Sequence, residues 1–438
     1  MTKPLKLIVI DDDPTGSQTV HSCLLLTQWD HATLREAMVD DSPLFFILTN
    51  TRGVDGARAG AITREVCQNL RDVLASLDRN GLPFTPVIVS RSDSTLRGHY
   101  PLETDIIAQE LGPFDGHFLV PAFFEGGRIT RDGMHYVVTN GNAVEAHNTE
   151  FARDSVFGYS TAYLPAYVEE KTRGRIRADD VVKVTLEDIR SGNIAKLLAL
   201  EGNRCCAVDA ETQADLDRFA GMVGDAMRQG KRFLFRSAAS LLTAFAALPP
   251  QPVSAQHMSK YRRENRAGAF VVGSHVGKTT QQLENLLKRP GTVGIEVPVD
   301  RLEHEADQVI ASVLDRIHAL HRDNVTPVIY TSRGERQFSD HAARLAFGER
   351  ISECLVIITA RLPASLGFLV AKGGITSHEV LRAGLELRAV RVLGQILPGC
   401  SVVQCPADHP RFPLLPVVIF PGNVGDEFGL ATVYDRFS

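Results

Sequence analysis

The sequence predicts an α/β protein with two α/β domains, mostly parallel sheets and a cleft between the domains. Two observations lead to this prediction. Short apolar runs rich in β-branched residues alternate with segments of helical apolar spacing along the 438 residues. A proline-rich and then charged segment, residues 248–267, has no periodic apolar face and interrupts this alternation. We therefore expect an N-terminal domain over residues 1–247, a linker over 248–267 and a C-terminal domain over 268–438.

Composition limits the classes of function. A net charge of -5 gives no general attraction to nucleic acid or to an anionic membrane. No apolar run reaches the length of about 18 residues that a membrane-spanning helix needs. Seven scattered cysteines without a CxxC motif argue against a disulfide framework and a thiolate zinc site. We expect a cytoplasmic enzyme with small-molecule partners, no nucleic-acid or membrane partner, and possible assembly into a homo-oligomer.

The N-terminal domain shows the βαβ rhythm that is typical of a parallel sheet. The expected strands are Leu7–Ile10, Leu44–Asn50, Pro86–Ser90, Phe118–Val120, Cys205–Asp209 and Arg232–Arg236. The expected helices are Arg58–Leu77, Pro101–Leu111 and Ala214–Met227, and His21–Thr27 is either a helix end or a second strand.

The C-terminal domain repeats this rhythm. Its expected strands are Phe270–Gly273, Gly294–Val297, Val328–Thr331, Leu355–Thr359, Gly367–Val370 and Val417–Phe420. Its expected helices are Thr279–Leu287, His304–His321, Gln337–Cys354 and Ser377–Leu385.

An acidic turn follows the first expected strand. Asp11, Asp12 and Asp13 come directly after the apolar run, and Pro14 and Gly16 set the turn. Ligands of open parallel sheets bind beyond the carboxyl ends of the strands, where these carboxylates would lie. Adjacent carboxylates repel one another unless a cation or a proton neutralises them, which favours a functional role. The alternative is an acidic turn that caps a helix beginning two to four residues later.

Two further strands of the N-terminal domain end in polar loops. One loop is RSDSTLRG, residues 91–98, and the other is PAFFEGGRITRDG, residues 121–133. Arg97 and Arg128 would supply the local positive charge that an anionic substrate needs in an acidic protein. Each arginine could instead form a structural salt bridge, to Asp93, Glu125 or Asp132.

Three glycine-containing loops follow strands of the C-terminal domain. The first, GSHVGKTT, contains Ser274 but is one residue too short for the phosphate-binding loop GxxxxGK[ST]. The second is LVAKGGITS and the third is VVIFPGNVGDEFG. Glycines let the backbone approach a phosphate, and the hydroxyls of Thr376 and Ser377 would serve as caps or phosphate donors. Together the loops favour a nucleotide site, and three ordinary tight turns are the alternative.

Six ordered motifs resemble the four-carbon acid sugar kinase family, formerly a domain of unknown function. The resemblance covers nearly the whole chain. The family patterns DDxTG, DSTLRG and GRxTxxG match Asp12, Asp13, Thr15 and Gly16, then residues 93–98, then Gly127, Arg128, Thr130 and Gly133. The patterns GSxxxxTxxQ, GGxTS and GNxGD match Gly273, Ser274, Thr279 and Gln282, then Gly373, Gly374, Thr376 and Ser377, then Gly422, Asn423, Gly425 and Asp426.

The resemblance implies an N-terminal domain that binds a sugar acid and a C-terminal domain that binds ATP. Phosphate would pass, with Mg²⁺, to the terminal hydroxyl of threonate, erythronate or 3-oxo-tetronate. Asp12 would be the catalytic base, and Asp13 would orient the turn or assist Mg²⁺. The expected substrate residues are Thr15, Asp93, Ser94, Thr95, Arg97, Gly98, Arg128 and Thr130. The expected nucleotide residues are Ser274, Thr279, Gly373, Gly374, Ile375, Thr376, Ser377, Gly422, Asn423 and Gly425.

Two residues depart from the family pattern. Asp11 is an additional acid where relatives commonly have a small residue, and Arg91 stands where a lysine is usual. Two alternatives stay open. Asp11, Asp13 and Thr15 also fit the DxDxT start of haloacid-dehalogenase-type phosphatases, in which Asp11 would be the nucleophile. A non-catalytic sensor of a sugar acid or a nucleotide is the other alternative.

Overall fold

The computed structural model describes residues 3–79, 81–139, 141–274, 276–333, 341–422 and 424–438. The chain divides into two compact units, Met1–Pro249 and Pro250–Ser438. Helices and a mostly parallel sheet make up each unit, so the predicted α/β class is confirmed. The predicted cleft between the domains stays a prediction.

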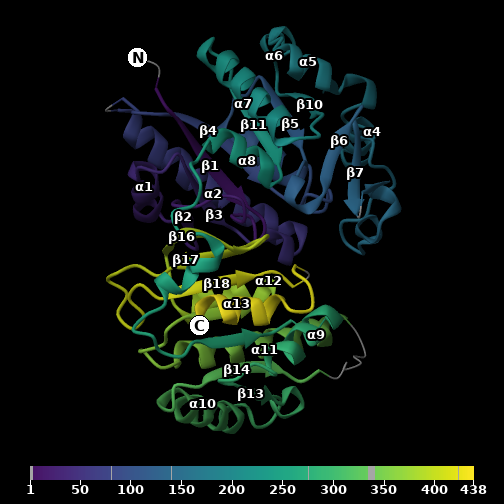
Figure 1. Ribbon diagram of the computed structural model, residues 1–438. Coiled ribbons are helices and arrows are strands. Elements are labelled where there is room, and N and C mark those ends of the chain that lie inside the picture. The colour runs from purple at the N-terminus through teal and green to yellow at the C-terminus, as the bar shows by residue number, and fades with distance from the viewer. Residues whose placement is uncertain (1–2, 80, 140, 275, 334–340, 423) are drawn as a thin grey trace. The chain divides into compact units, whose positions relative to one another are not determined.

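The first unit is built on a parallel sheet (Figure 1). Its strands are β1 Leu5–Asp11, β2 Leu24–Leu26, β3 Leu44–Leu48, β4 Thr85–Arg91, β5 Gly116–Val120, β9 Val182–Val184, β10 Arg204–Val208 and β11 Phe233–Ser237. They lie in the order β2-β3-β1-β4-β11-β5-β10-β9, and neighbouring strands are parallel. The apolar residues of β1 are buried because parallel sheets are covered on both faces.

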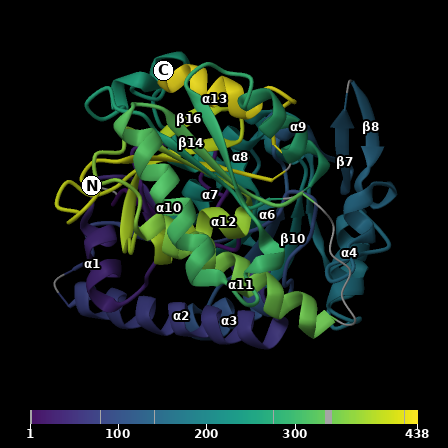
Figure 2. The same ribbon diagram turned by 90° about the horizontal axis from the view of Figure 1, so that it is seen from below.

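The helices of the first unit connect these strands. They are α1 His31–Val39, α2 Gly56–Asp78, α3 Leu102–Leu111, α4 Leu164–Lys171, α5 Leu186–Ser191, α6 Ala195–Leu198, α7 Gln213–Arg228 and α8 Ala239–Ala246. Both α1 and α3 pack against α2 (Figure 2). The Asp55 carboxylate caps α2 by accepting the Arg58 N–H, and Thr212 begins α7 with a capping box.

A small antiparallel sheet, which the sequence did not predict, follows β5. Its strands are β6 Arg128–Arg131, β7 Met134–Thr139 and β8 Asn142–Glu145, in the order β6-β7-β8. The strands are short and β8 is mostly exposed, so they lack the continuous apolar run of the central strands. The strand β6 carries Arg128 and Thr130 of the second polar loop.

The second unit has a mixed sheet. Its strands are β12 Ala269–Val272, β13 Thr292–Val297, β14 Thr326–Thr331, β15 Leu369–Lys372, β16 Ala389–Leu397, β17 Cys400–Gln404 and β18 Pro416–Phe420. The order is β13-β14-β12-β15-β18-β17-β16, and only β17 and β16 are added antiparallel. The helices are α9 Gly277–Leu286, α10 Ala306–Arg322, α11 His341–Ala360, α12 Gly374–Glu379 and α13 Gly429–Phe437, and a π-helical segment, Val380–Gly384, continues α12.

One predicted strand of this unit is wrong. Leu355–Thr359 belongs to α11, whose predicted start, at Gln337, lies outside the described residues. Leu355 and Ile358 are buried whereas Ile357 is 36% exposed, which is a helical pattern of burial. A short apolar run cannot by itself distinguish a buried strand from a buried turn of helix. The hairpin of β16 and β17 was not predicted.

The segment predicted as a linker contains a 3-10 helix, Ala255–Tyr261. Its Met258 is fully buried and belongs to the core cluster of the second unit, together with Phe270 and Phe368. This part of the segment therefore packs as part of the second unit, and the boundaries 248–267 stay a prediction.

The seven cysteines are buried and free, in agreement with the predicted absence of a disulfide framework. Within the residues that the structure describes, we find no helix with the length and apolarity needed to cross a lipid bilayer.

Candidate functional site

The polar loops of the first unit meet at the carboxyl ends of neighbouring strands. The strand β1 lies between β3 and β4, so the chain reverses its direction of travel across the sheet at β1. Ligands of open α/β sheets bind at such a switch point. The acidic turn after β1, residues 49–52 after β3 and residues 91–98 after β4 are all at this point.

Local hydrogen bonds fix the acidic turn. The Thr15 amide donates to Asp13 Oδ1 at 2.8 Å, and the Thr15 hydroxyl donates to the same oxygen. The Gly16 amide donates to the Asp13 carbonyl at 3.1 Å. A Cβ built on Gly16 would lie 1.8 Å from Asp11 Oδ2, so only glycine fits against this carboxyl group. The turn therefore exists to pack closely over Asp11, and it holds Thr15 against Asp13.

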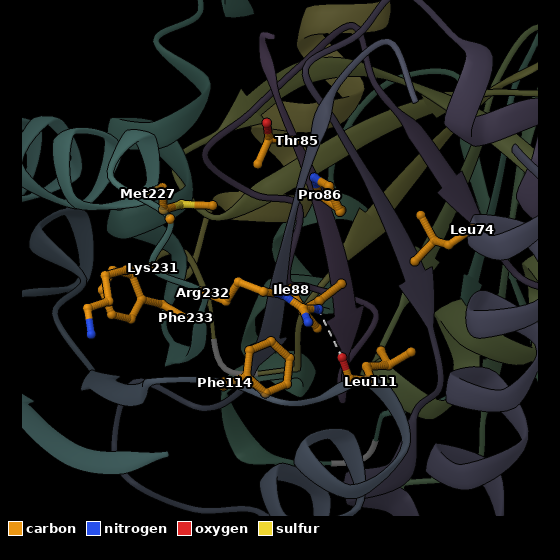
Figure 3. A pocket seen from close by; sticks show the side chains of 11 residues that line it. Leu74, Thr85, Pro86, Ile88, Leu111, Phe114, Met227, Lys231, Arg232 and Phe233 are labelled. Carbon is orange, nitrogen blue, oxygen red and sulfur yellow. Dashed lines mark hydrogen bonds between the residues drawn. The ribbon is translucent and has the colours of Figure 1, made fainter. Parts of the chain in front are cut away.

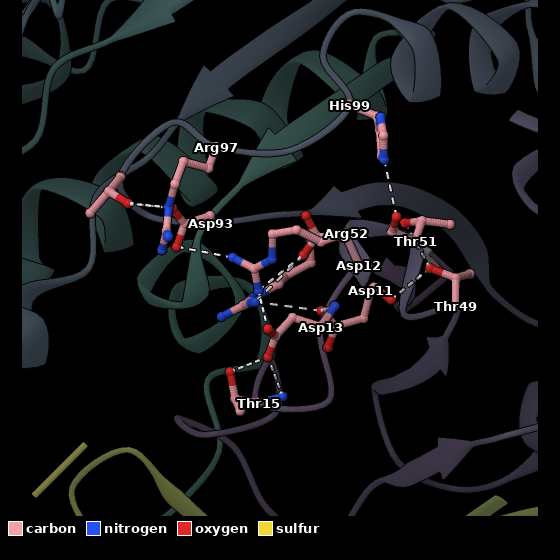
Figure 4. A network of polar contacts seen from close by, with 12 residues as sticks. Asp11, Asp12, Asp13, Thr15, Thr49, Thr51, Arg52, Asp93, Arg97 and His99 are labelled. Carbon is pink, nitrogen blue, oxygen red and sulfur yellow. Dashed lines mark hydrogen bonds and ion pairs between the residues drawn. The ribbon is translucent and has the colours of Figure 1, made fainter. Parts of the chain in front are cut away.

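Arg52, which the sequence analysis did not single out, connects the carboxylates (Figure 4). Its guanidinium pairs with Asp13 Oδ2, lies 3.1 Å from Asp93 Oδ1 and is 3.7 Å from Asp12 Oδ1. Arg52 lies in a 3-10 turn, Thr51–Gly53, directly after the polar end of β3. The only sequence signal for it is its place after a buried strand that ends in polar residues.

Asp11 and Arg91, the two residues that depart from the family pattern, are cross-strand neighbours. They occupy the last register position of the β1–β4 pair, and Arg91 Nη1 lies 3.5 Å from Asp11 Oδ1. Asp11 is fully buried and Arg91 is 4% exposed. The two departures from the family pattern therefore lie in contact with one another.

Burial separates the proton affinities of the three aspartates. Burial raises the pKa of Asp11 to about 8, assisted by repulsion from Asp12 and Asp13 and opposed by Arg91. Burial likewise raises the pKa of Asp12 to about 7, with the Glu103 charge adding to the shift and Arg52 opposing it. Burial also disfavours ionised Asp13, but Arg52, Arg91 and the Thr15 hydrogen bonds outweigh it and lower the pKa of Asp13. Asp12 is thus a base poised near neutral pH.

The Asp12 carboxylate has two unused acceptors. It is 2% exposed, and neither of its oxygens accepts a hydrogen bond from any described residue. Gly98 lies beside it with a φ of 117°, and a Cβ there would stand 3.0 Å from Asp12 Oδ2 and 3.1 Å from Arg236 Nη2. Gly98 therefore leaves room between a buried carboxylate and a buried guanidinium.

A second buried pair lies behind Asp12. Arg236 Nη1 is 3.7 Å from Glu103 Oε2, and neither atom has a hydrogen-bond partner among the described residues. The Thr51 hydroxyl donates to Glu103 Oε1 at 2.5 Å, and Arg236 also lies over the Tyr100 ring. Neither Glu103 nor Arg236 was predicted, because one lies on a helix and the other inside an apolar strand.

The two predicted substrate arginines differ in their partners. Arg97 Nε donates to Asp93 Oδ2 at 2.8 Å, which is the structural salt bridge considered as the alternative. Arg128 forms no ion pair within the described part of the chain, and its buried Nε has no hydrogen-bond partner there. Both guanidinium groups lie over the Phe151 ring, at 5.2 and 5.6 Å from its centroid. Arg128 is therefore the less neutralised cation.

Three other predicted substrate residues have internal partners. The Thr95 hydroxyl donates to Asp93, and the Ser94 carbonyl interacts with His135 Nε2 at 2.7 Å. Thr130 is fully buried, and its hydroxyl lies 3.0 Å from His135 Nδ1. These contacts make the loop of residues 93–98 rigid and connect it to β6.

The glycine loops of the second unit also come together at strand ends. Ser274 follows β12, Gly373 follows β15, and Gly422 follows β18, and these strands are neighbours in the order β12-β15-β18. Ser274 Oγ lies 3.1 Å from Thr279 Oγ1, which donates to the Gly422 carbonyl at 3.2 Å. A Cβ on Gly373 would contact Thr376 Oγ1 at 3.2 Å and Ser274 Cβ at 3.3 Å. Asn423 lies outside the described residues.

The remaining predicted nucleotide residues divide between surface and interior. Ile375 is 63% exposed, whereas the Ser377 side chain is buried and its hydroxyl donates to the Ala371 carbonyl. Gly425 has a φ of 79° in the loop after β18. A cavity of about 180 Å³ opens beside Gly273, Ile375 and Thr376 and is otherwise lined mainly by residues 348–356 of α11 and by residues 379 and 380.

Another cavity lies at the opposite edge of the first unit's sheet (Figure 3). Its volume is about 290 Å³, and it lies beside Thr85 and Phe233, the first residues of β4 and β11. Its Arg232 is engaged, because Nη2 donates to the Leu111 carbonyl at 3.1 Å and the guanidinium lies over the Phe114 ring. The mostly apolar lining offers no carboxylate, so the chemistry lies at the other edge.

Comparisons with known protein families decide between the alternatives. Residues 7–245 match the family described as the sugar-binding N-terminal domain, and residues 269–430 match the nucleotide-binding C-terminal domain. The chain belongs to the four-carbon acid sugar kinase family. This membership confirms the predicted family and the prediction of a sugar acid kinase. The phosphatase and sensor alternatives receive no support from these matches.

Curated and solved relatives agree with this assignment. A D-erythronate kinase of Heliobacterium modesticaldum is 25% identical, over 98% of this chain and 96% of the relative. A Haemophilus influenzae protein of the family DUF1537 has a solved structure with a TM-score of 0.67 and 17% identity, covering 98% of this chain and 100% of its own. A Salmonella typhimurium LT2 structure, described as a candidate tRNA synthase, gives a TM-score of 0.68 at 19% identity, covering 99% of this chain and 100% of its own. At these identities the two structures show the fold alone.

Proposed function

We propose that this kinase transfers the terminal phosphoryl group of ATP to the terminal hydroxyl of a four-carbon acid sugar, such as erythronate, threonate or 3-oxo-tetronate. The observation that carries the proposal is the state of Asp12. Its buried carboxylate has no hydrogen-bond partner among the described residues and a pKa raised to about 7. A kinase needs such a group to accept the proton of the attacking hydroxyl.

Asp13 and Asp93 have supporting roles in this proposal. Both carboxylates pair with Arg52, which neutralises them and fixes their orientation. Asp13 also accepts the Thr15 amide, so we assign it to orienting the acidic turn. Asp12, the least neutralised of the three carboxylates around Arg52, is left for proton transfer.

Arg128 is our candidate for the substrate carboxylate. Its side chain is unpaired among the described residues, and burial together with repulsion from Arg97 lowers its pKa. A substrate carboxylate would relieve both effects by forming a charge-assisted pair. Arg97 and the Thr95 hydroxyl, which already bind Asp93, would position this loop. Thr130, being fully buried, would act behind the substrate through His135.

The family's nucleotide-binding domain and the kinase relative support ATP as the phosphate donor. The described residues contain no group of three or more His, Cys, Asp or Glu side chains placed to hold a metal ion. This donor set fits Mg²⁺, which is usually held by one or two carboxylates together with substrate phosphates. We propose that Mg²⁺ binds with ATP and neutralises charge on the transferred phosphoryl group. The cytoplasmic location and the homo-oligomer stay predictions.

The proposed base makes activity depend on pH in a defined direction. Asp12 must be ionised to accept a proton, and its pKa is raised to about 7 by burial. We expect kcat/KM for the acid sugar to fall about tenfold per pH unit below this pKa and to be nearly constant above it. Initial rates between pH 5 and pH 9, with ATP saturating, measure the profile. A flat profile down to pH 5 would remove Asp12 from the role of base.

Gly374 offers a clean test of the nucleotide loop. A Cβ at this position meets no atom within 4 Å, so Gly374→Val introduces no clash in the ligand-free protein. If the backbone approaches a phosphate here, the valine side chain will obstruct it. We expect ATP affinity, measured by calorimetry, to fall at least tenfold while binding of the acid sugar is retained.

The matched control is Gly221→Val in α7 of the first unit, where a Cβ also meets no atom within 4 Å. This variant should bind ATP like the wild type. Equal ATP affinity in Gly374→Val and wild type would place the phosphates elsewhere.

A further inference from the structure

A fully buried lysine ends the central strand of the second unit. Lys372 is the last residue of β15, and its side chain has no exposed surface. Among the described residues no carboxylate forms an ion pair with it. A buried ammonium group loses its hydration, which costs free energy unless hydrogen bonds replace the lost water. Such a residue needs a reason for its position.

The partners of Lys372 belong to one loop. Its Nζ donates to the Pro421 carbonyl at 2.6 Å and to the Gly422 carbonyl at 3.1 Å. The ammonium also lies over the Phe420 ring, 4.1 Å from the centroid. These three residues end β18 and begin the loop after it, and Phe420 is the register partner of Lys372 in the sheet. Lys372 therefore holds the start of this loop from beneath.

Two other buried side chains hold the same loop. The Thr279 hydroxyl donates to the Gly422 carbonyl at 3.2 Å, so this oxygen accepts two hydrogen bonds. Gln282 Nε2 donates to the carbonyls of Val424 and Asp426 at 3.0 and 2.7 Å. Thr279, Gln282 and Lys372 are each 0% exposed. The carbonyl groups of the loop are thus directed into the protein.

The direction of the carbonyls fixes the direction of an amide. In a trans peptide the carbonyl group and the following N–H point in opposite directions. Since the Pro421 carbonyl points at Lys372, the Gly422 N–H points away from it. This N–H donates no hydrogen bond to a described residue, and a Cβ on Gly422 would have only Ser274 Oγ near it, at 3.5 Å. A free amide therefore lies next to the predicted nucleotide residue Ser274.

We propose that Lys372 is a positioning residue of the nucleotide site, which holds the Pro421 and Gly422 peptides so that the Gly422 amide faces the nucleotide phosphates. The inference rests on the proposed function, because it takes these loops to bind ATP. The lysine acts through the loop, and its positive charge beneath the loop favours the phosphates as well.

The protonation of Lys372 gives the proposal a specific signature. Burial lowers the pKa of Lys372 to about 7, with Lys278 adding repulsion and the facing Cys400 acting in the opposite direction. Burial in turn raises the pKa of the Cys400 thiol, so that group stays neutral. At pH 8 the free protein therefore holds Lys372 largely neutral, and binding of phosphates favours the charged form. We expect ATP binding at pH 8 to take up a proton at this residue.

The test is ATP binding to Lys372→Met, measured by calorimetry at pH 8 in two buffers of different ionisation enthalpy. We expect the Kd to rise at least tenfold, because two charge-assisted hydrogen bonds to the loop are lost. The wild type should take up a fraction of a proton that this variant does not. Lys288→Met, the same change at an exposed lysine of the segment after α9, is the matched control and should bind ATP within twofold of the wild type.

Each outcome decides the proposal. An unchanged Kd in folded Lys372→Met, while the wild type binds ATP, overturns this inference and leaves the proposed function intact. Failure of the wild type to bind ATP overturns the proposed function itself. If Lys372→Met does not fold, two other measurements decide. Proton uptake by the wild type at pH 8, together with weaker ATP binding by Thr279→Val, supports the proposal, and no uptake overturns it.

Discussion

Asp12→Asn is expected to lower kcat by roughly two to four orders of magnitude, the usual contribution of a general base, with ATP affinity close to that of the wild type. The amide is nearly isosteric with the carboxylate but cannot accept the proton of the substrate hydroxyl. The position is buried and its oxygens have no hydrogen-bond partner among the described residues, so few native contacts are lost. Steady-state kinetics and calorimetry measure the two quantities separately.

The neighbouring variant Asp11→Asn is the matched control. Burial raises the pKa of Asp11 to about 8, so this group is mostly protonated at pH 7 and an amide resembles its native state. We expect a loss of kcat below about tenfold. A phosphatase that used Asp11 as its nucleophile would give the reverse ranking, with Asp11→Asn inactive and Asp12→Asn mildly affected. That ranking would refute Asp12 as the base.

Arg52→Met is expected to have the second large effect, on stability and on substrate binding together. The change leaves Asp13 and Asp93 buried without their main cation. Breaking a buried ion pair from one side costs about 3 to 5 kcal/mol. We expect a loss of this size in the free energy of unfolding at pH 7, and a raised KM for the acid sugar. Arg58→Met, at an exposed arginine of α2 with no ion pair among the described residues, should change stability by less than about 0.5 kcal/mol.

The pH dependence of this loss has a definite sign. In the wild type burial opposes ionisation, but Arg52 outweighs it and lowers the pKa of both Asp13 and Asp93. These carboxylates therefore stabilise the folded state above their unfolded pKa of about 3.9, and the stabilisation is lost as the pH falls below it. Without Arg52, burial raises both pKa values, and protonation relieves the folded state. The stability difference between Arg52→Met and wild type should thus narrow from pH 7 to pH 3. A difference that is independent of pH would contradict the pairing.

Much of the fold was predictable because its central strands are continuous apolar runs. The strands β1, β3, β4 and β5 and the helices α2 and α7 follow simple periodic patterns. The error at Leu355–Thr359 has a physical cause, since four buried or half-buried apolar residues in a row satisfy both a buried strand and one face of a helix. The small sheet of β6, β7 and β8 was missed because its strands are short and partly exposed.

The candidate site was predictable where a motif marks it. The acidic turn and the loop of residues 93–98 do come together at adjacent strand ends. Arg52, Glu103 and Arg236 were missed because each is a single charged residue in an ordinary element. Only the sheet order, which places β1 between β3 and β4 and β11 next to β4, brings these side chains to the aspartates. Long-range pairing of this kind leaves no local signal in one sequence.

Release of ADP as a function of added acid sugar tests the central claim most directly. The wild type is incubated with ATP and Mg²⁺, with and without erythronate, threonate or 3-oxo-tetronate, and Asp12→Asn serves as the background. The account predicts that ADP forms only when one of these acids is present, in equal amount to a phosphorylated acid, and that the preferred acid has the highest kcat/KM. No ADP with any four-carbon acid, or phosphate released from phosphoesters without ATP, would contradict it.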